Sequence, residues 1–393
     1  MMWTMDSAKS AHLMQVVYSL VLGGSERLAC DLALRLDPRR NRSSICALAH
    51  GGPLAGTLHN AAIPFHIIGC GPGFQWRVVP KLYRLFRDNK VDVVQTHHLK
   101  QLVYSAIGAR LAGAALVHVE HEHFSLRPPR ARWLLRLMAP LCHHIVAIGD
   151  DVKTFLVNGV GLPAARITVI PNGVDVARYQ PEPRRARDAL GLRPHHRLIG
   201  HVARLEPEKD QVSLLQAFRT VADAHPDVRL VIVGDGSQRR ELERAATELG
   251  VEGRVDFLGV REDVPDLLPH FDVFVLSSSS EGLPLSILEA MACARPVVAT
   301  AVGEISRVVT NGVTGMTVPP GNAPALAHAM SMMLDRPAWA AAMGAAARRL
   351  VESAYSLTRV VEQYQALYAS VYAARGYDLP TLGDSDITPP RTR

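Results

Sequence analysis

The chain has 393 residues, of which 48% are apolar and 20% are charged, as is typical of folded proteins. At about 100–200 residues per domain this length favours two domains, and the apolar content excludes disorder over most of the chain. No apolar run approaches the ~18–20 residues of a membrane span, and the first ten residues show no secretory pattern. We therefore expect a cytoplasmic protein.

Charge is distributed unevenly along the chain. Residues 1–190 contain 23 Lys and Arg against 13 Asp and Glu, whereas residues 191–393 contain 20 against 24. A basic first half favours an anionic partner, which could be nucleic acid, an acidic membrane surface or a phosphorylated substrate. An arginine-rich proteome would give the same bias. The five scattered cysteines include no C-x-x-C pair and predict reduced thiols.

The expected elements are short apolar strands that alternate with helices. The first half predicts strands at 12–18, 91–95, 116–121 and 144–148, and helices at 25–36 and 80–86. The second half predicts strands at 198–202, 229–233, 255–258, 271–276 and 296–300, and helices at 211–225 and 239–249. Continuous apolar strands that alternate with helices form parallel sheets covered on both faces, so we predict two α/β domains.

A turn-rich break at 170–175, followed by a polar proline-containing segment at 181–185, separates the two halves. We therefore expect an N-terminal domain, a linker, a C-terminal domain, a final helix and a disordered tail. Their expected bounds are 1–178, 179–192, 193–356, 357–375 and 376–393, respectively.

The segment 271–291 carries the first candidate chemistry. An apolar strand ends in four serines, after which Glu281 precedes a helix that contains Glu289. Such a strand–loop–helix edge presents free backbone N–H groups and the positive end of a helix dipole, which favour an anion. Eight helical residues span ~12 Å, which is too far for the carboxylate pair of a glycosidase. We expect the two carboxylates to hold different parts of one elongated ligand; the alternative is two ordinary surface charges.

Two further loops have the composition of anion sites. Arg204 and Lys209 follow a strand and precede a helix, and a planar guanidinium beside a point charge suits a diphosphate. Gly23 and Gly24 lie between a strand and a helix, where a ligand could approach the backbone closely. The alternatives are solvated loop charges in the first case and a turn that requires positive φ in the second.

In this order, the motifs resemble those of the retaining glycosyltransferases of family four, which have the GT-B fold of two facing Rossmann-like domains with parallel sheets. The family's E-x7-E element is Glu281 to Glu289, its G-x-x-x-R-x-x-x-x-K element runs from Gly200 to Lys209, and its V-I-P-N-G-V-D stands intact at 169–175. The resemblance covers roughly 12–375. The final helix resembles the helix with which this family returns to the N-terminal domain.

The resemblance implies a role for each motif. Glu281 would face the sugar of a nucleotide diphosphate sugar, Glu289 would bind its ribose, and Arg204 with Lys209 would hold its diphosphate. Further donor-binding residues would be Gly23, Gly24, Gly282, Leu283 and Ser286. The segment 300–307 departs from the family's T-x-x-G-G-x-P-E, because Glu304 replaces the second glycine and Arg307 the glutamate.

The first domain would bind the acceptor through histidines. His121 matches the histidine that ends a strand at the family's transfer centre, so the implied catalytic residues are Glu281, His121, Arg204 and Lys209. His97 matches the second histidine of the family's V-V-H-T-H, and Gln95 stands at the first. With His123, these histidines form the implied acceptor-binding set.

A metal site formed by His118, His121 and His123 is an alternative, because zinc sites use histidines. We expect these three side chains on one strand face and those of Glu120 and Glu122 on the other. Asp384-Ser385-Asp386 resembles the D-x-D of other transferases but falls in the expected tail. The transfer requires no metal, so we expect neither a metal nor a cofactor beyond the sugar nucleotide.

The implied activity is transfer of a sugar, with retention, from a UDP-sugar to a hydroxyl acceptor in cell-surface polysaccharide or glycolipid synthesis. The alternatives are a same-fold UDP-sugar 2-epimerase and a non-catalytic nucleotide-sugar-binding protein. An NAD dehydrogenase is disfavoured because Gly234-Asp235-Gly236 lacks the third glycine of the fingerprint. A nucleic-acid partner is not expected, because no basic–aromatic motif is present.

The segment 127–138 has the pattern of an interfacial helix. A helix after Pro129 would place two arginines on one face and a band of Trp133, Leu134, Leu137 and Met138 on another. This pattern favours contact with an anionic membrane, with a cytoplasmic protein bound at the inner face. The alternative is that the band packs on the sheet while the arginines face water.

Overall fold

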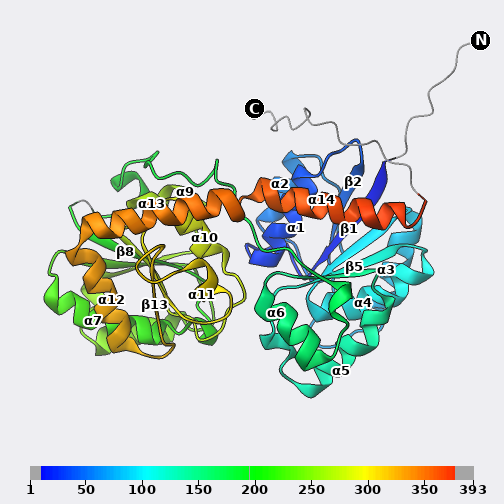
Figure 1. The fold of residues 1–393 in the computed structure, drawn as a ribbon. Coiled ribbons are helices and arrows are strands. Elements are labelled where there is room, and N and C mark those ends of the chain that lie inside the picture. The colour runs from blue at the N-terminus through cyan, green and yellow to red at the C-terminus, as the bar shows by residue number, and fades with distance from the viewer. Residues whose placement is uncertain (1–9, 194, 377–393) are drawn as a thin grey trace, which may run out of the picture. The chain divides into compact units, whose positions relative to one another are not determined.

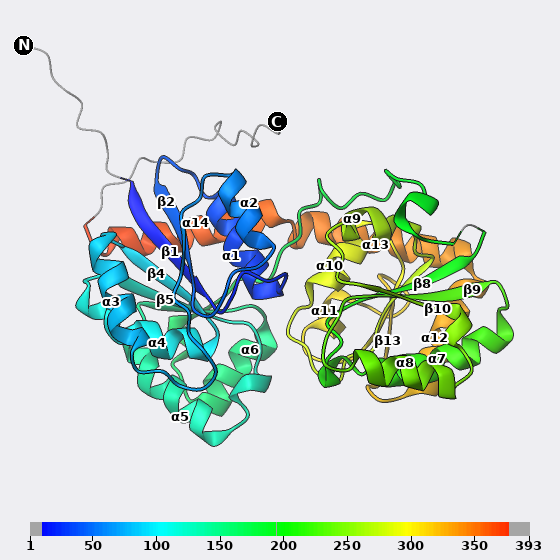
Figure 2. The same cartoon turned by 180° about the vertical axis from the view of Figure 1, so that it is seen from behind.

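The computed structural model describes residues 10–193 and 195–376. The chain divides into two compact units: the residues up to Pro171 with those from Val360 form unit 1, and Asn172–Arg359 form unit 2. Each unit is a parallel sheet with helices on both sides, as Figure 1 and Figure 2 show. The predicted α/β class with two Rossmann-like domains is confirmed.

Unit 1 contains a seven-stranded sheet in the order β3-β2-β1-β4-β5-β6-β7. The strands are β1 (Ala11–Val17), β2 (Asn41–Ala47), β3 (Phe65–Ile67), β4 (Val93–His97), β5 (Ala115–Glu120), β6 (His144–Ala147) and β7 (Ile167–Val169). The helices are α1 (Gly24–Arg35), α2 (Leu54–Asn60), α3 (Val78–Asp88), α4 (His98–Leu111), α5 (Pro129–Met138) and α6 (Asp150–Thr154). Helices α1 and α2 cover one side of the sheet, and α3, α4 and α5 cover the other (Figure 1, Figure 2).

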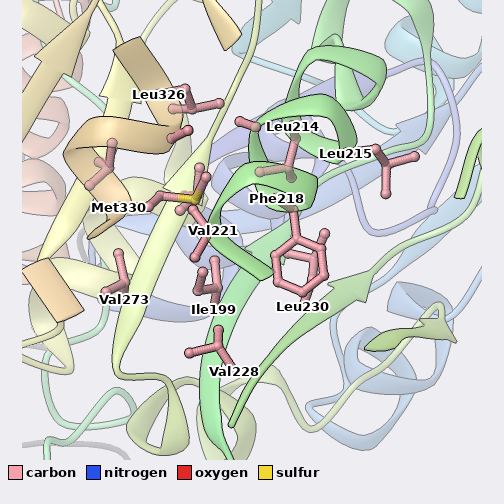
Figure 3. Packing of buried hydrophobic residues seen from close by; sticks show 14 of the residues in the cluster. Ile199, Leu214, Leu215, Phe218, Val221, Val228, Leu230, Val273, Leu326 and Met330 are labelled. Atoms are coloured by element: carbon pink, nitrogen blue, oxygen red, sulfur yellow. The ribbon is translucent and has the colours of Figure 1, made fainter. Parts of the chain in front are cut away.

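Unit 2 contains a six-stranded sheet in the order β10-β9-β8-β11-β12-β13. The strands are β8 (Arg197–Val202), β9 (Val228–Val233), β10 (Val255–Gly259), β11 (Val273–Leu276), β12 (Val297–Thr300) and β13 (Met316–Val318). The helices are α7 (Gln211–Ala224), α8 (Arg239–Glu248), α9 (Val264–Leu267), α10 (Leu285–Ala292), α11 (Ile305–Val308), α12 (Ala323–Asp335) and α13 (Pro337–Ala354). Its core packs Phe218 of α7 and Met330 of α12 onto Ile199 and Leu230 of the sheet (Figure 3).

The strands that sequence reasoning did not predict are short or polar. Strands β3, β7 and β13 each have three residues and form sheet edges, where short strands are common. Strand β2 begins with the polar sequence Asn41-Arg42-Ser43-Ser44. Ser44 can be buried because its hydroxyl forms a hydrogen bond with Nε2 of His12, at 2.7 Å. The strand expected at 116–121 ends one residue earlier, so His121 is the first residue after β5.

The segment 179–192, expected as a linker, packs on unit 2. Tyr179 is buried there, and Arg187 donates hydrogen bonds to the carbonyl oxygens of His196 (2.6 Å) and His270 (3.2 Å). The boundary of the units falls earlier than expected, at Pro171–Asn172. Helix α14 (Leu357–Ala373) occupies the place of the expected final helix, and from Val360 on the chain belongs to unit 1. The expected tail beyond residue 376, with Asp384 to Asp386, lies outside the described residues.

Candidate functional site

The first group of predicted site residues lies at the carboxyl ends of β8 and β11. These two strands are neighbours at the point where the strand order of unit 2 reverses, and ligands of open α/β sheets bind at such a point. The serines after β11 hold the loop after β8 in place. The Ser277 hydroxyl donates to the carbonyl oxygen of Lys209 (2.9 Å), and the Ser279 amide donates to that of Glu208 (2.8 Å).

Lys209 and Glu281 meet at this edge. The Lys209 ammonium donates to Oε1 of Glu281 at 2.6 Å, and the Ser278 hydroxyl donates to the same oxygen at 2.6 Å. Both side chains are largely buried, with 14% of Lys209 and 8% of Glu281 exposed. An ammonium group has three N–H donors, so Lys209 can hold Glu281 and bind an anion at the same time.

Arg204 stands on the solvent side of the same loop. Its side chain is 66% exposed and pairs with Glu208 at 3.1 Å, so its guanidinium is free to reorient toward a ligand. The loop beneath it is held by Gln211, which donates to the carbonyl oxygen of Arg204 at 2.8 Å and lies 3.3 Å from Nε2 of His201. Burial, with the Lys209 charge, lowers the pKa of His201 to about 4, so this histidine is neutral.

Glu289 lies in α10 and accepts a hydrogen bond from the hydroxyl of Tyr179 at 2.6 Å. Both side chains are buried. Four residues before α10 begins, Glu281 lies in the loop that leads into it, and Ser286 is half-buried in the first turn. The two glutamates therefore contact different partners, Lys209 and Tyr179.

The loop from Glu281 to Leu283 is clamped from two sides. Asn172, from the V-I-P-N-G-V-D motif, donates to the carbonyl oxygen of Leu283 at 2.8 Å. The backbone amide of Glu304 donates to the carbonyl oxygen of Gly282 at 3.2 Å. Gly303 has φ +51, and a Cβ there would collide with the carbonyl oxygen of Glu281, which explains the glycine.

The departure from the family's pattern at 304–307 has a local structural account. Glu304 is buried and its carboxylate pairs with Nε of Arg307 at 3.3 Å. The two unusual residues thus compensate each other in charge.

The second group lies in unit 1, where β4 and β5 end side by side. Nδ1 of His97 lies 2.9 Å from Nε2 of His121, and Nε2 of His97 lies 2.9 Å from Oε1 of Gln15 in β1. Burial, with the neighbouring His98 and His118, lowers the pKa of His97 to about 3. Burial, with the neighbouring His98, lowers the pKa of His121 well below its usual value. Both histidines are neutral, and His97 is fully buried, so it reaches a ligand only through His121.

A buried carboxylate, Glu120, lies beside this pair. Its oxygens lie 3.5 Å from Nε2 of His118 and 3.7 Å from Nδ1 of His98. Burial alone would raise the pKa of Glu120, but these two histidines lower it to about 2. Burial alone would lower the pKa of His98, but the contact with Glu120 raises it. His98 therefore holds a proton more readily than a free histidine does, whereas its neighbour His121 holds one less readily.

Gly23 and Gly24 lie where β1 gives way to α1, near His98. Ser25, the residue that follows them, has its hydroxyl 3.1 Å from Nε2 of His98. The same hydroxyl donates to Glu26 at 2.9 Å. The glycine loop is thereby tied to the histidine cluster of unit 1.

The expected arrangement of the β5 histidines is wrong for His118. Residues two apart on a strand share a face, so His118 points with Glu120 and not away from it. His123 lies apart from His97 and His121, 3.6 Å from Asp151 and beside the ring of Phe155. Within the described ranges, no group of three or more histidine, cysteine or acidic residues is arranged to hold a metal ion.

Sequence reasoning missed the residues that hold the predicted ones. Ser278 was one of four serines in a row, and nothing in the sequence singled it out as the partner of Glu281. Tyr179 lay in a segment expected to be a linker. Gln15 and Tyr368 are separated from His97 by 82 and 271 residues, so only the fold brings them near it.

Family models match both halves of the chain. A model described as glycosyltransferase family 4 matches residues 22–178, and one described as glycosyl transferases group 1 matches residues 184–350. Among solved structures, HepE from Anabaena in complex with UDP-glucose is 27% identical with a TM-score of 0.80, over 91% of this chain and 99% of that one.

Two curated relatives extend this picture. A UDP-Gal:α-D-GlcNAc-diphosphoundecaprenol α-1,3-galactosyltransferase of Escherichia coli is 30% identical over 60% of this chain and 65% of its own length. A GDP-mannose-dependent α-(1-6)-phosphatidylinositol monomannoside mannosyltransferase of Mycolicibacterium smegmatis is 32% identical over 69% of this chain and 74% of its own length. Together with the matched family models and the two parallel-sheet units, these relatives show that the chain is a GT-B glycosyltransferase and belongs to glycosyltransferase family 4.

Proposed function

We propose that this glycosyltransferase moves a sugar from a UDP-sugar to a hydroxyl acceptor with retention of anomeric configuration. The observation that carries the proposal is the contact of Lys209 with Glu281 at the switch point of the unit 2 sheet. One side chain supplies positive charge for a diphosphate, and the other supplies a carboxylate for sugar hydroxyls. Glu289, one turn into α10, supplies a second carboxylate for the ribose.

In this reaction the bond between C1 of the sugar and the diphosphate oxygen breaks. A bond from the acceptor oxygen to C1 forms on the same face, and the proton of the acceptor hydroxyl passes to the departing diphosphate oxygen. Negative charge develops on the diphosphate as the bond breaks. Lys209 and Arg204 oppose that charge, so they stabilise the transition state more than the ground state.

The UDP-sugar assignment rests on the likeness to HepE, whose solved complex contains UDP-glucose. A relative that is 32% identical depends on GDP-mannose, so the base is the part of the proposal most open to test. Isothermal titration with UDP, GDP and ADP, followed by transfer assays with the matching sugars, tests it. Tighter binding of GDP than of UDP would overturn the choice of base.

The same assay separates transfer from epimerisation. A transferase releases UDP in proportion to added acceptor, whereas a 2-epimerase interconverts the sugar without an acceptor. We expect acceptor-dependent release of UDP and a product with the anomeric configuration of the donor. An inverted product would contradict retention.

We propose that no metal ion takes part, because Lys209, Arg204 and backbone amides can hold the diphosphate. Activity should survive EDTA at a concentration that strips divalent ions. Loss of activity that magnesium or manganese restores would contradict this part of the proposal.

We propose that the acceptor is a glycan or lipid-linked glycan of cell-surface polysaccharide or glycolipid synthesis. The support is two relatives named for a GlcNAc-diphosphoundecaprenol and a phosphatidylinositol monomannoside substrate. None of the described helices is long and apolar enough to cross a membrane. Helix α5 nevertheless exposes 62% of Trp133 and 51% of Leu137, and buries Leu135. The neighbouring α4 exposes Ile107 and Leu111.

These exposed apolar side chains, with the exposed Arg130 and Arg136, have the chemistry of a surface that binds an anionic membrane. Each arginine near such a surface contributes about 1 kcal/mol, screened by salt. The wild type should co-sediment with anionic liposomes at low salt, and changing Arg130, Arg132 and Arg136 together to serine should release it.

A matched variant with Arg219, Arg240 and Arg244 of unit 2 changed to serine loses the same charge from exposed helix positions. It should sediment like the wild type. Equal sedimentation of both triple variants would contradict a specific surface on α5.

A further inference from the structure

A buried line of hydrogen bonds connects α14 to the end of β5. The Tyr368 hydroxyl donates to Oε1 of Gln95 at 2.6 Å, and Nε2 of Gln15 donates to the Tyr368 oxygen at 3.4 Å. Oε1 of Gln15 lies 2.9 Å from Nε2 of His97, and Nδ1 of His97 lies 2.9 Å from Nε2 of His121. The first four side chains are almost completely buried, and only His121 retains a little exposure. All five belong to unit 1.

The direction of this line is set at Tyr368. A separation of 2.6 Å suits an O–H···O bond and is short for N–H···O. Gln95 therefore presents its oxygen to the tyrosine, and the single hydroxyl proton of Tyr368 is donated to that oxygen. The Tyr368 oxygen is left to accept, so Gln15 turns its NH₂ group toward Tyr368 and its oxygen toward His97.

The proton positions on the two histidines follow from that orientation. Because Gln15 presents an acceptor, Nε2 of His97 must carry a proton and donate. His97 is neutral, so its Nδ1 is bare and accepts from Nε2–H of His121. His121 is neutral as well, so its own Nδ1 is a bare acceptor. The Nε2 of Gln95 also lies 3.5 Å from Nε2 of His97, but the much shorter contact of that nitrogen with Oε1 of Gln15, at 2.9 Å, decides where its proton points.

We propose that Tyr368, acting through Gln95, Gln15 and His97, is a positioning residue that fixes the tautomer of His121. In that tautomer the proton is on Nε2 and the lone pair on Nδ1 is presented to the substrate. A lone pair accepts a hydrogen bond from a sugar hydroxyl and repels a phosphate oxygen. This inference rests on the proposed function for its choice of substrate, but the tautomer is a property of the free protein.

Helix α14 is built to deliver this contact. Tyr364, Tyr368 and Tyr372 recur every four residues and are all buried, so they share the face of α14 that packs on unit 1. The Tyr372 hydroxyl donates to Oδ1 of Asn41 in β2 at 2.9 Å, away from the histidines. Tyr372 is therefore a matched control for Tyr368, on the same helix and with the same type of bond.

The primary experiment is ¹⁵N NMR of histidine-labelled protein without substrate, with the His121 signals identified by their loss in His121→Gln. The wild type should show one His121 tautomer, protonated on Nε2. Tyr368→Phe should give a mixture of the two tautomers, and Tyr372→Phe should match the wild type. A wild-type His121 protonated on Nδ1, or an unchanged tautomer in Tyr368→Phe, would overturn the proposal.

Gln95→Met supplies a second test with the opposite sign, and it also serves if Tyr368→Phe does not fold. Without the Gln95 oxygen, Tyr368 can give its proton to Gln15, which then turns its NH₂ group toward His97. The whole line reverses, and His121 should become protonated on Nδ1. Retention of the Nε2 proton would contradict the assigned direction.

A rescue variant separates the tautomer from a general packing defect. In the Tyr368→Phe background, Gln15→Glu places an acceptor-only carboxylate against His97, which restores the Nε2 proton without the tyrosine. The single tautomer should return. In Tyr368→Phe, kcat should fall roughly three- to tenfold through loss of one hydrogen bond, and the rescue variant should recover it. Persistence of the mixture would count against the proposal.

Because the NMR measurement uses no substrate, it can fail or succeed independently of sugar transfer. If the proposed function is wrong, the protein should transfer no sugar from any sugar nucleotide, while the NMR signals still show the Nε2 tautomer of His121.

Discussion

The two units share one architecture but place opposite chemistry at their strand ends. In unit 2, the loops after β8 and β11 hold ions: Lys209 against Glu281, and Arg204 against Glu208. In unit 1, the ends of β4 and β5 hold two neutral rings, His97 against His121, beside the buried carboxylate of Glu120. The same parallel-sheet edge therefore serves an anion in one case and directional hydrogen bonds in the other.

Because of this difference, the two units should respond to different changes in residues and in solution conditions. A contact between full charges depends on which charged groups are present and on salt. A line of neutral imidazoles and amides depends on the direction of each hydrogen bond and on pH, because protonation of one ring breaks the line. Substitutions in unit 2 should therefore act through charge, and those in unit 1 through proton position.

The sharpest test of the charge side of the comparison is Lys209→Ala beside Arg204→Ala. Each removes a charge-assisted contact to the leaving diphosphate worth roughly 1.5–3 kcal/mol, so turnover should fall about ten- to a hundredfold. The control is Arg219→Ala. Arg219 is an exposed arginine of α7 that pairs with Asp223 at 3.1 Å, away from the predicted diphosphate site, and this variant should be near wild type. Wild-type turnover in both site variants would show that the diphosphate binds elsewhere.

The next largest effect should separate the two glutamates. Glu289→Gln should weaken binding of free UDP several-fold, because a carboxylate accepts hydrogen bonds from ribose more strongly than an amide does. Glu281→Gln should leave UDP affinity nearly unchanged and lower turnover. Isothermal titration with UDP and a transfer assay measure both.

Tyr179→Phe sharpens the same comparison. It removes the hydroxyl that Glu289 accepts at 2.6 Å, so it should weaken UDP binding less than Glu289→Gln does and leave Glu281 unaffected. Unchanged UDP affinity in Glu289→Gln would rule out the ribose assignment.

The fold of both units was within reach of the sequence because apolar strands and helices alternate clearly. The candidate ions of unit 2 were also within reach, because Arg204, Lys209, Glu281 and Glu289 fall on loops and helix starts that the alternation locates. Contacts within one loop pair, such as Lys209 with Glu281, follow once β8 and β11 are neighbours.

The histidine line of unit 1 was out of reach for a physical reason. Its direction depends on Tyr368, which lies on α14, far along the chain from Gln15 and Gln95. The four-residue spacing of the tyrosines shows that they share one face of α14, but it does not show which strands that face packs against. The face of His118 was a different kind of error, since the two-residue period of a strand already pairs it with Glu120.

The two units should also differ in their response to acid. The pKa values of His97 and His121 are lower in the folded protein than in the unfolded chain. Below about pH 6.5 the unfolded chain therefore binds protons that folded unit 1 does not bind, so unit 1 loses stability as pH falls. For His97, whose pKa is lowered to about 3, this should cost about 1 kcal/mol between pH 7 and pH 5.5, and His121 acts in the same direction. The raised pKa of His98 opposes this, since its contribution is present below its unfolded pKa and is lost as pH rises.

In unit 2 the one fully buried histidine with a strongly lowered pKa is His201, among the described residues. Hydrogen exchange at pH 7 and pH 5.5 compares the units directly. Amides of β1 and β4 should lose more protection than those of β8 and β11. An equal or larger loss in unit 2 would contradict the comparison.

The smallest expected effect concerns two tyrosines of α14 that differ only in what their hydroxyls meet. Tyr364 is buried and its hydroxyl has no hydrogen-bond partner within residues 10–193 and 195–376, whereas that of Tyr372 donates to Asn41. Removing an unpaired buried hydroxyl relieves a desolvation cost. Removing a paired one leaves its acceptor without a donor, which costs about 1 kcal/mol of stability. Tyr364→Phe should therefore leave the denaturation midpoint of unit 1 unchanged or raise it, and Tyr372→Phe should lower it. Both should keep the His121 tautomer of the wild type, because neither hydroxyl belongs to the line that starts at Tyr368. A Tyr364→Phe variant less stable than Tyr372→Phe would show that the hydroxyl of Tyr364 is satisfied in solution.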